Sequence, residues 1–204
     1  KVVDIQKKPR TSTPAPPFIT STLQQEAGRK LGFTVSQTML IAQHLYEHGF
    51  ITYMRTDSVN LSKLCLSTSK EEIVSKYGEE YSKVRQYQTK SKGAQEAHEA
   101  IRPTYMNKEE IEGNAPEKRL YDLIRKRTIA SQMADAELEK TTVTISVSGT
   151  DACFVATGEV ITFDGFLKVY HEGVDDEDIS GEETNMLPHT EPGDTLSRNE
   201  IVAT

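Results

Sequence analysis

Hydrophobic residues follow two different periods along this chain. Over the first 140 residues they recur every three or four positions, which predicts helices over residues 21–30, 34–48 and 62–78 and a further helix that starts at Asn114. From residue 141 the period is two, with a turn at 149–151 and a second alternating run over 154–163. The sequence therefore predicts an α+β fold that is mainly helical at first and ends in an antiparallel β segment.

The ends of the predicted helices carry capping signals. Ser21 and Thr34 each open a capping-box pattern, in which a short polar side chain accepts from an unpaired backbone N–H. Gly32 and Gly49 lie where the first two helices should stop. Asn114 stands just before a helical first turn that contains a proline, which favours a helix start there.

The same periodicity assigns the faces of two helices. On the second helix Met39, Ala42 and Tyr46 form an apolar stripe at spacings of three and four, with Ile41 and Leu45 alongside, and we expect this stripe to be buried. On the last helix we expect the basic run 125–127 to face solvent or a polyanion. The predicted core positions of that helix are Leu120, Leu123 and Ile124.

A short stretch after the second helix predicts a strand. Residues 50–54 are rich in β-branched and aromatic side chains. Two short helices, a tight turn and a strand resemble a helix-turn-helix with a wing. The sequence thus predicts a winged-helix-like domain in the helical part of the chain.

The two ends of the chain predict a separate β segment. Residues 1–10 alternate loosely and predict an edge strand, and residues 195–203 predict a last one. Residues 11–17 hold three prolines, which is typical of a linker or a domain crossing. The expected divisions are a first β segment over 1–12, a helical domain over 13–139 and a second β segment over 140–204.

Composition limits the class of protein. The chain has 204 residues, of which 36% are hydrophobic, and no apolar run near the ~20 residues of a membrane span. Cys65 and Cys153 lie far apart, which favours reduced thiols and a cytoplasmic protein. The net charge of −7 comes from residues 171–204, which hold ten acidic residues and one basic residue and include an expected acidic loop over 171–194. The rest is slightly basic, so a nucleic-acid partner is compatible with the charge.

Tyr53 and Arg55 are the first candidates for catalysis. A tyrosine oxygen can act as a covalent nucleophile when its proton is easily removed, and the planar guanidinium of an arginine can hold two phosphate oxygens. Two residues apart on a strand, the two side chains point to the same face. Thr56 and Ser58 add hydroxyl groups that could contact DNA. A core tyrosine beside a surface arginine is the alternative.

His98 is the centre of a second candidate cluster. It lies between Glu96 and Glu99, and Arg102 follows four residues later. A histidine can hydrogen-bond a phosphate or transfer a proton near neutral pH, and the arginine could bind another phosphate. A structural histidine beside solvated charges fits the same pattern. We find no metal-ligand spacing and no nucleotide-binding glycine motif in the sequence.

Three segments resemble one known family. Residues 16–27, PPFITSTLQQEA, are similar to the opening of the cleavage domain in type IA DNA topoisomerases. Residues 49–58, GFITYMRTDS, resemble the active-site signature of that family. Residues 95–104, QEAHEAIRPT, resemble the histidine motif of bacterial topoisomerase I, and residues 163–169 are similar to a weaker stretch.

The resemblance implies a role for each residue. Tyr53 would attack a backbone phosphate of single-stranded DNA and become linked to the 5′ phosphate. Arg55 would hold that phosphate, and His98 would lie close to the cleavage site. The covalent link would store the phosphodiester energy, so that a strand could pass and the break be resealed without ATP. The DNA partners would be single strands and negatively supercoiled duplexes, which the enzyme relaxes.

The resemblance also implies parts that this sequence does not contain. Family members carry an acidic domain that binds Mg²⁺ and a further DNA-binding domain. We therefore expect a central fragment of a longer protein, formed by the tyrosine domain and part of a β arch, which is inactive by itself. The alternatives are a non-catalytic winged-helix DNA-binding module, in which Tyr53 belongs to the core, and a purely structural arch module.

Overall fold

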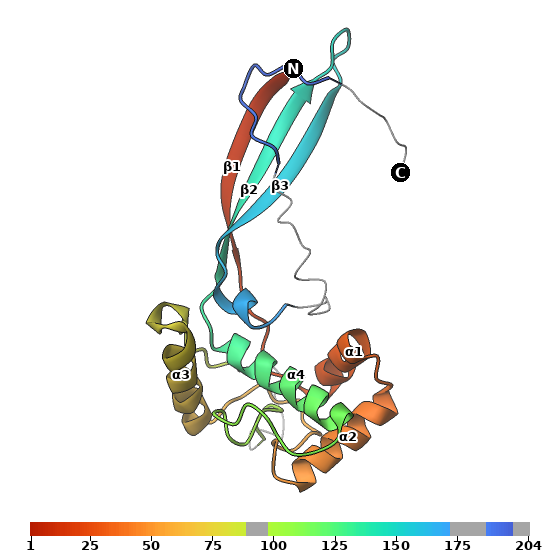
Figure 1. The fold of residues 1–204 in the computed structure, drawn as a ribbon, viewed down its shortest axis with the longest axis vertical. Coiled ribbons are helices and arrows are strands. Elements are labelled where there is room, and N and C mark those ends of the chain that lie inside the picture. The colour runs from red at the N-terminus through yellow and green to blue at the C-terminus, as the bar shows by residue number, and fades with distance from the viewer. Residues whose placement is uncertain (89–97, 172–186, 198–204) are drawn as a thin grey trace. The chain divides into compact units, whose positions relative to one another are not determined.

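A computed structural model of the chain describes residues 1–88, 98–171 and 187–197. The chain forms two compact units, each seen in Figure 1. The helical unit comprises residues 13–135 and 165–179, and the sheet unit comprises residues 1–12, 136–164 and 180–204. The main elements are β1 (Val2–Ser12), α1 (Thr20–Leu31), α2 (Val35–Glu47), α3 (Lys63–Tyr77), α4 (Ala115–Ser131), β2 (Ala136–Ser146) and β3 (Cys153–Phe163). The predicted α+β class is confirmed.

The helices begin and end close to the predicted signals. Thr34 caps α2 by accepting from the Gln37 N–H at 3.2 Å, and Asn114 and Glu117 cap α4 in both directions of a capping box. Helix α1 starts at Thr20 rather than Ser21, and there the Thr22 hydroxyl accepts from the Ile19 N–H. Local polar side chains therefore set these boundaries, as the sequence indicated.

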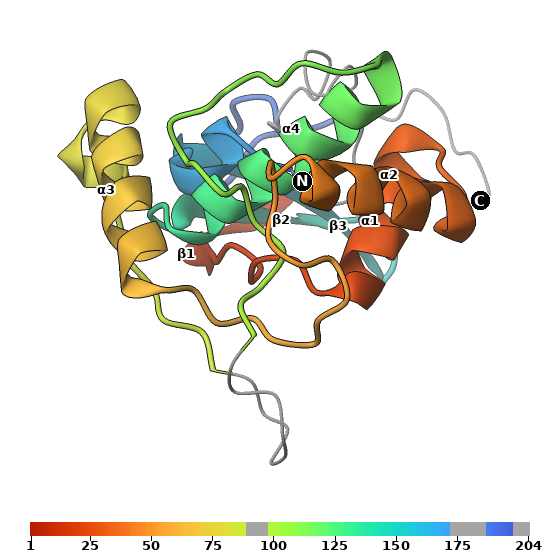
Figure 2. The same cartoon turned by 90° about the horizontal axis from the view of Figure 1, so that it is seen from below.

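Helix α4 forms the centre of the helical unit. Figures 1 and 2 show α1 and α2 on one side of α4 and α3 on its other side. The predicted core residues Leu120, Leu123 and Ile124 are at most 5% exposed, which confirms that face of the helix. The apolar side chains of α2 and α4 are thus buried against one another and hold the unit together.

The basic run on α4 is not on the surface, contrary to the expectation from its charge. Arg125 is 9% exposed and donates to Glu72 at 2.6 Å, while Arg127 is 4% exposed. Arg127 donates to the carbonyl of Pro16 at 2.7 Å and to the Tyr170 hydroxyl at 3.3 Å. Burial raises the pKa of Tyr170, although the Arg127 charge opposes this shift. Both guanidinium groups therefore bind partners distant in sequence rather than solvent, although the buried Nε of Arg125 has no hydrogen-bond partner among the described residues.

The predicted wing strand over residues 50–54 is wrong. Among the described residues of this stretch only Ile51 makes a β-bridge, an isolated one with Pro103. A strand needs a paired neighbour along its length, and here the neighbour meets it at one position. The turn between α1 and α2 is as predicted, with Gly32 at a φ of 68°.

The sheet unit is an antiparallel three-stranded sheet in the order β1-β2-β3. Residues 1–10 do form an edge strand, and the alternating stretch pairs as predicted, with Val143 between Ile5 and Ala156. Strand β2 starts at Ala136, five residues before the period-two pattern. Its charged beginning pairs through backbone groups with the end of β1, and this pairing requires no hydrophobic alternation.

Two predictions concern the end of the chain. The described residues 195–197 are not in a strand, and residues 198–203 lie outside the described part, as does most of the acidic stretch 171–194. The described segment 187–197 forms no helix or strand, although the Asp194 carbonyl accepts from the Val2 N–H at 2.8 Å.

No helix in the described ranges is both long and apolar enough to cross a membrane.

Candidate active site

Residues 50–58, the Tyr53 segment, expose every second side chain. Tyr53 is 39% exposed, and Arg55 and Asp57 are also exposed. Between them Met54 and Thr56 are 4% and 5% exposed. Tyr53 and Arg55 thus reach solvent from the same segment, as their spacing predicted, even though the segment is not a strand.

Thr20 holds the Tyr53 segment to the start of α1. Its hydroxyl donates to the carbonyls of Met54 and Thr56 and accepts from the Thr56 N–H at 2.9 Å. The Thr20 N–H donates to the Thr56 carbonyl at 3.0 Å. The backbone on the carboxyl side of Tyr53 is therefore fixed by a single threonine from the first motif.

Thr52 holds the other side of Tyr53 to residues 98–104, the His98 segment. The Thr52 hydroxyl donates to the Ala100 carbonyl at 2.6 Å and accepts from the Arg102 N–H at 3.0 Å. The Thr52 N–H donates to the Arg102 carbonyl at 2.9 Å. The His98 segment is also tied to the first motif, since the Ile101 N–H donates to Phe18 at 2.8 Å. Three segments distant in sequence thus meet around Tyr53.

Two aromatic rings flank the ring of Tyr53. The ring of His98 lies with its centroid 6.3 Å from that of Tyr53 and at 38° to it. On the α2 side, Tyr46 makes an edge contact with Tyr53 at 5.3 Å between centroids and 65° between planes. Within the described residues the Tyr53 hydroxyl has no hydrogen-bond partner, so its oxygen is available to a ligand.

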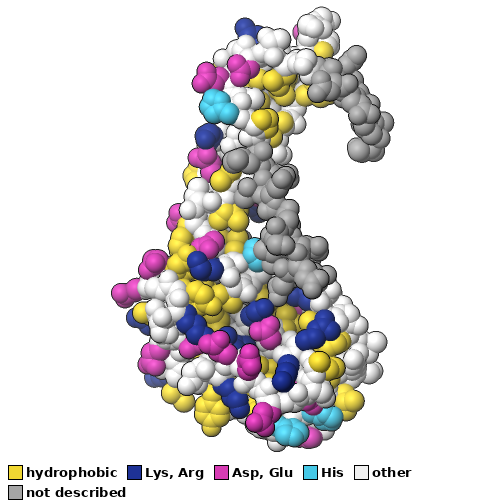
Figure 3. Space-filling view, viewed as in Figure 1, with side chains coloured by type: hydrophobic (Ala, Val, Ile, Leu, Met, Phe, Trp, Pro, Cys, Tyr) yellow, Lys and Arg dark blue, Asp and Glu magenta, His cyan; other side chains and the backbone are white. Residues whose placement is uncertain are grey.

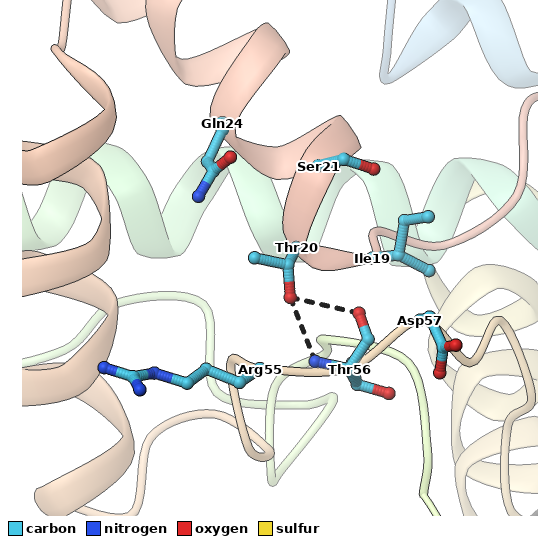
Figure 4. Close-up of a pocket in the computed structure, with 7 residues that line it drawn as sticks. All are labelled: Ile19, Thr20, Ser21, Gln24, Arg55, Thr56 and Asp57. Carbon is cyan, nitrogen blue, oxygen red and sulfur yellow. Dashed lines mark hydrogen bonds between the residues drawn. The ribbon is translucent and has the colours of Figure 1, made fainter. Parts of the chain in front are cut away.

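Arg55 lines an open hollow of about 400 Å³ beside the start of α1. Figure 4 shows Arg55 and Asp57 pointing in opposite directions from the chain, with Ser21 and Gln24 above them on α1. Tyr53 and His98 do not line this hollow. The structure therefore brings Tyr53 and His98 together, and places the guanidinium of Arg55 in an adjoining space with room for a phosphate.

The other predicted DNA contacts are occupied by the protein itself. The Thr56 hydroxyl accepts from the Ser58 N–H at 3.0 Å, and Ser58 is 1% exposed. The side chain of Arg102 is 12% exposed and donates to Glu99 at 2.9 Å and to the Pro103 carbonyl at 2.8 Å. Glu99 in turn accepts from the Ser62 N–H at 2.6 Å, at the start of α3. In this arrangement Thr56, Ser58 and Arg102 stabilise the backbone that forms the site.

Residues of both charge signs belong to the segments of the site, among them Arg55 and Asp57, which are both exposed. On the face of the helical unit shown in Figure 3, basic and acidic side chains are intermixed. Among the described residues no three His, Cys, Asp or Glu side chains gather where they could hold a metal ion. Glu96 of the second motif lies outside the described residues. The described residues therefore do not fit a Mg²⁺ site.

Sequence reasoning missed the two threonines and misplaced Tyr46. Thr20 and Thr52 lie inside the recognised motifs, but nothing in their spacing indicates which carbonyls they bind. Tyr46, expected on the buried stripe of α2, is 43% exposed. A usable signal existed, because Tyr46 precedes Tyr53 by seven residues across the turn at Gly49, and this separation permits an aromatic contact.

Comparisons with known proteins agree on one family. A family model described as DNA topoisomerase matches residues 1–203. DNA topoisomerase 1 of Zymomonas mobilis is 46% identical over 99% of this chain and 17% of its own length. DNA topoisomerase 1 of Synechococcus elongatus is 47% identical over all of this chain and 23% of its own length. The chain thus spans about a fifth of the length of these curated relatives.

The fold is similar to that of a solved structure as well. The structure of full-length topoisomerase I from Thermotoga maritima matches with a TM-score of 0.72 at 38% sequence identity. The match covers 86% of this chain and 30% of that one.

Proposed function

Because the chain belongs to the bacterial DNA topoisomerase I family, we propose that its helical unit is the strand-cleaving part of a type IA enzyme. The observation that carries the proposal is the exposed ring of Tyr53, which lies beside His98 on a segment fixed from both sides. An exposed tyrosine with a free hydroxyl and a rigid backbone is what a covalent nucleophile needs.

In the proposed reaction Tyr53 attacks a backbone phosphate of single-stranded DNA. The bond from the tyrosine oxygen to phosphorus forms while the bond from phosphorus to the 3′ oxygen breaks, and the phenolic proton ends on that leaving oxygen. The DNA is then held by a 5′-phosphotyrosine link of similar energy to the bond that was broken. The reverse reaction reseals the strand without ATP, after another strand has passed and negative supercoils have been relaxed.

Arg55 and His98 have separate roles in this proposal. Arg55 binds phosphate oxygens with its planar guanidinium from the adjoining hollow and stabilises the charge that develops in the transition state. His98 lies close enough to Tyr53 to hydrogen-bond the attacked phosphate or to transfer a proton. Both are exposed or half-buried, so a DNA strand can reach them.

We assign Thr56, Ser58 and Arg102 to the support of the site. Each uses its polar atoms within the protein, and a DNA contact would leave a partner unsatisfied. The Arg102–Glu99 pair connects the His98 segment to α3. These three residues therefore act on DNA through the geometry of Tyr53 and His98.

Metal chemistry is proposed to come from outside this chain. No carboxylate cluster of the described residues fits Mg²⁺, so the proposed roles of Tyr53, Arg55 and His98 involve no metal bound by these residues. The acidic domain implied by the family resemblance is the proposed holder of Mg²⁺ and the partner that activates Tyr53. The two cysteines, Cys65 and Cys153, are free, which supports a cytoplasmic location.

The test is formation of a covalent adduct with a labelled single-stranded oligonucleotide. We expect the chain alone to give no adduct. When the acidic domain of a family member is added with Mg²⁺, a labelled band that resists detergent should appear on a gel. Tyr53→Phe should abolish the band while DNA binding is kept, because only the hydroxyl oxygen is removed.

The outcome also separates the alternatives. An adduct that persists in Tyr53→Phe would show that another residue is the nucleophile. DNA binding without an adduct in every combination would favour the non-catalytic binding module. Absence of DNA binding throughout would favour a structural arch module.

A further inference from the structure

Tyr46 is the one aromatic side chain of α2 in ring contact with Tyr53 among the described residues. The two rings meet edge to face, with centroids 5.3 Å apart and planes at 65°. This is the arrangement that the charge distribution of aromatic rings favours, with the positive edge of one ring toward the negative face of the other. The contact therefore has a preferred geometry and can orient a ring.

The backbone that carries the two rings is rigid on both sides of the contact. Helix α2 ends in a Schellman motif, in which Gly49 has a φ of 73°, the Phe50 N–H donates to the Leu45 carbonyl and the Gly49 N–H donates to the Tyr46 carbonyl. Beyond the turn, Thr52 is fixed by the His98 segment. The main chain at Tyr53 is thus held, whereas its hydroxyl has no hydrogen-bond partner among the described residues.

The side-chain torsions of Tyr53 then depend on its ring contacts. His98 makes the more distant of the two ring contacts, with its centroid 6.3 Å from that of Tyr53, and it belongs to a segment that is held by backbone hydrogen bonds. Tyr46 supplies the closer contact and comes from a regular helix. Without Tyr46, more rotamers of Tyr53 become accessible, and fewer molecules hold the oxygen where a phosphate can meet it.

We infer that Tyr46 is a positioning residue, which holds the ring of Tyr53 in its reactive orientation through the edge contact. This inference rests on the proposed function of Tyr53. Tyr46 itself touches neither the scissile phosphate nor the leaving oxygen in the proposed reaction. The Tyr46 hydroxyl makes no hydrogen bond with the described residues, so the ring alone is required and a phenylalanine at this position should be sufficient.

The first experiment needs no catalysis. Tyrosine rings of the 204-residue chain are isotopically labelled, and their NMR signals are assigned by single tyrosine-to-phenylalanine changes. In Tyr46→Leu the Tyr53 ring signals should move, because the ring-current shift from the neighbour is lost. In Tyr46→Phe they should stay near their wild-type positions. Tyr105→Leu is the matched control, since Tyr105 is 65% exposed and its ring contacts no other ring among the described residues.

The second experiment measures adduct formation and DNA binding in the complemented system. Tyr46→Leu should lower the single-turnover rate about 2- to 10-fold, the range expected for one aromatic pair, with an unchanged dissociation constant for the oligonucleotide. Tyr46→Phe should restore the rate. The same rate in Tyr46→Leu as in wild type would overturn the inference.

A different result would point to another role. Weaker oligonucleotide binding with an unchanged single-turnover rate would mean that Tyr46 stacks on a base of the substrate, and would overturn the positioning role. If wild type forms no adduct either, the proposed function falls. The NMR comparison still tests in that case the ring contact on which the inference depends, and unmoved Tyr53 signals in Tyr46→Leu would overturn the inference.

Discussion

Buried side chains are distributed differently in the helical unit and the sheet unit. Helix α4 buries ten of its 17 residues, and its apolar side chains fill the centre of the helical unit. In the described part of the sheet unit the buried hydrophobic residues are Val2, Ala136 and Val143, while Phe154 is 57% exposed. Figure 3 likewise shows hydrophobic side chains on the visible surface of the sheet unit.

The two units therefore depend on different interactions. Three strands of 11 residues hold the sheet through continuous backbone pairing, with exposed cross-strand ion pairs such as Lys7–Glu139 and Arg10–Glu159. Exposed ion pairs of this kind add little stability. The helical unit depends on packed side chains and on polar side chains bound to backbone groups. The catalytic candidates lie in the helical unit, whose stability depends most on the identity of its side chains. Such packing fixes the positions of the reacting groups, which catalysis requires.

The strongest test compares two phenylalanines. Phe18 in the helical unit is 0% exposed, and we expect Phe18→Ala to lower the free energy of unfolding of that unit by about 3–5 kcal/mol. Phe154→Ala in β3 should cost at most about 0.5 kcal/mol, since that ring is largely in water already. Native-state amide hydrogen exchange, measured by mass spectrometry, gives each unit its own value. Equal losses would contradict the contrast.

Two glycines give the next largest effect. Gly165, in the helical unit, has a φ of 50°, and a Cβ there would collide with the carbonyl of Asp135. Gly165→Ala should therefore cost about 2–4 kcal/mol, from left-handed strain plus the clash. Gly149, in the turn after β2, has a φ of 82° but open space around it.

Gly149→Ala should accordingly cost only the strain, about 1–2 kcal/mol. The same hydrogen-exchange measurement, read over the helices for one variant and over the strands for the other, checks the difference. A larger loss at Gly149 than at Gly165 would mean that close packing is not what distinguishes the units.

The smallest effect at neutral pH concerns Tyr121, whose hydroxyl donates to the Lys108 carbonyl at 2.6 Å. Burial raises the pKa of Tyr121 to about 12, against the opposing charge of Arg125. Because the phenol ionises near pH 10 once unfolded, its contribution to stability is present below pH 10 and is lost as the pH rises toward 12.

Tyr121→Phe should thus lower the free energy of unfolding by about 1 kcal/mol at pH 8, because the hydrogen bond is lost. Between pH 10 and 12 the free energy of unfolding of the variant should fall less steeply than that of the wild type. Urea unfolding followed by the helical circular dichroism signal at several pH values measures both. Parallel curves for the two proteins above pH 10 would contradict the burial of this phenol.

Much of the fold could be predicted because its signals are local. The boundary at Asn114 depends on a side chain three residues away from its partner, and the β2–β3 hairpin depends on alternation within each strand. The wing strand failed for the opposite reason. β-branched residues at 50–54 favour extended backbone, but a strand also needs a neighbour, and only Pro103 meets Ile51.

The site was predictable in its residues and less so in its contacts. Tyr53, Arg55 and His98 could be named from motifs, and the even spacing of Tyr53 and Arg55 gave their shared exposure. The burial of Arg127 could not be predicted, because its partners at Pro16 and Tyr170 lie far away in the sequence. A charge pattern shows that a residue needs a partner and does not show whether water or protein supplies it.

The meeting of three segments around Tyr53 also sets an order of events in folding. Ile101 bridges Phe18, and Thr52 binds Ala100 and Arg102, so the surroundings of the tyrosine close only when two long loops have closed. Long-range contacts of this kind form late, since loop entropy must be lost before they are made. During synthesis the helices up to α3 can form first. The backbone on the Thr52 side of Tyr53 can be fixed only after residue 102 has been added, so the surroundings of the nucleophile are completed at the same time as the segment that carries His98.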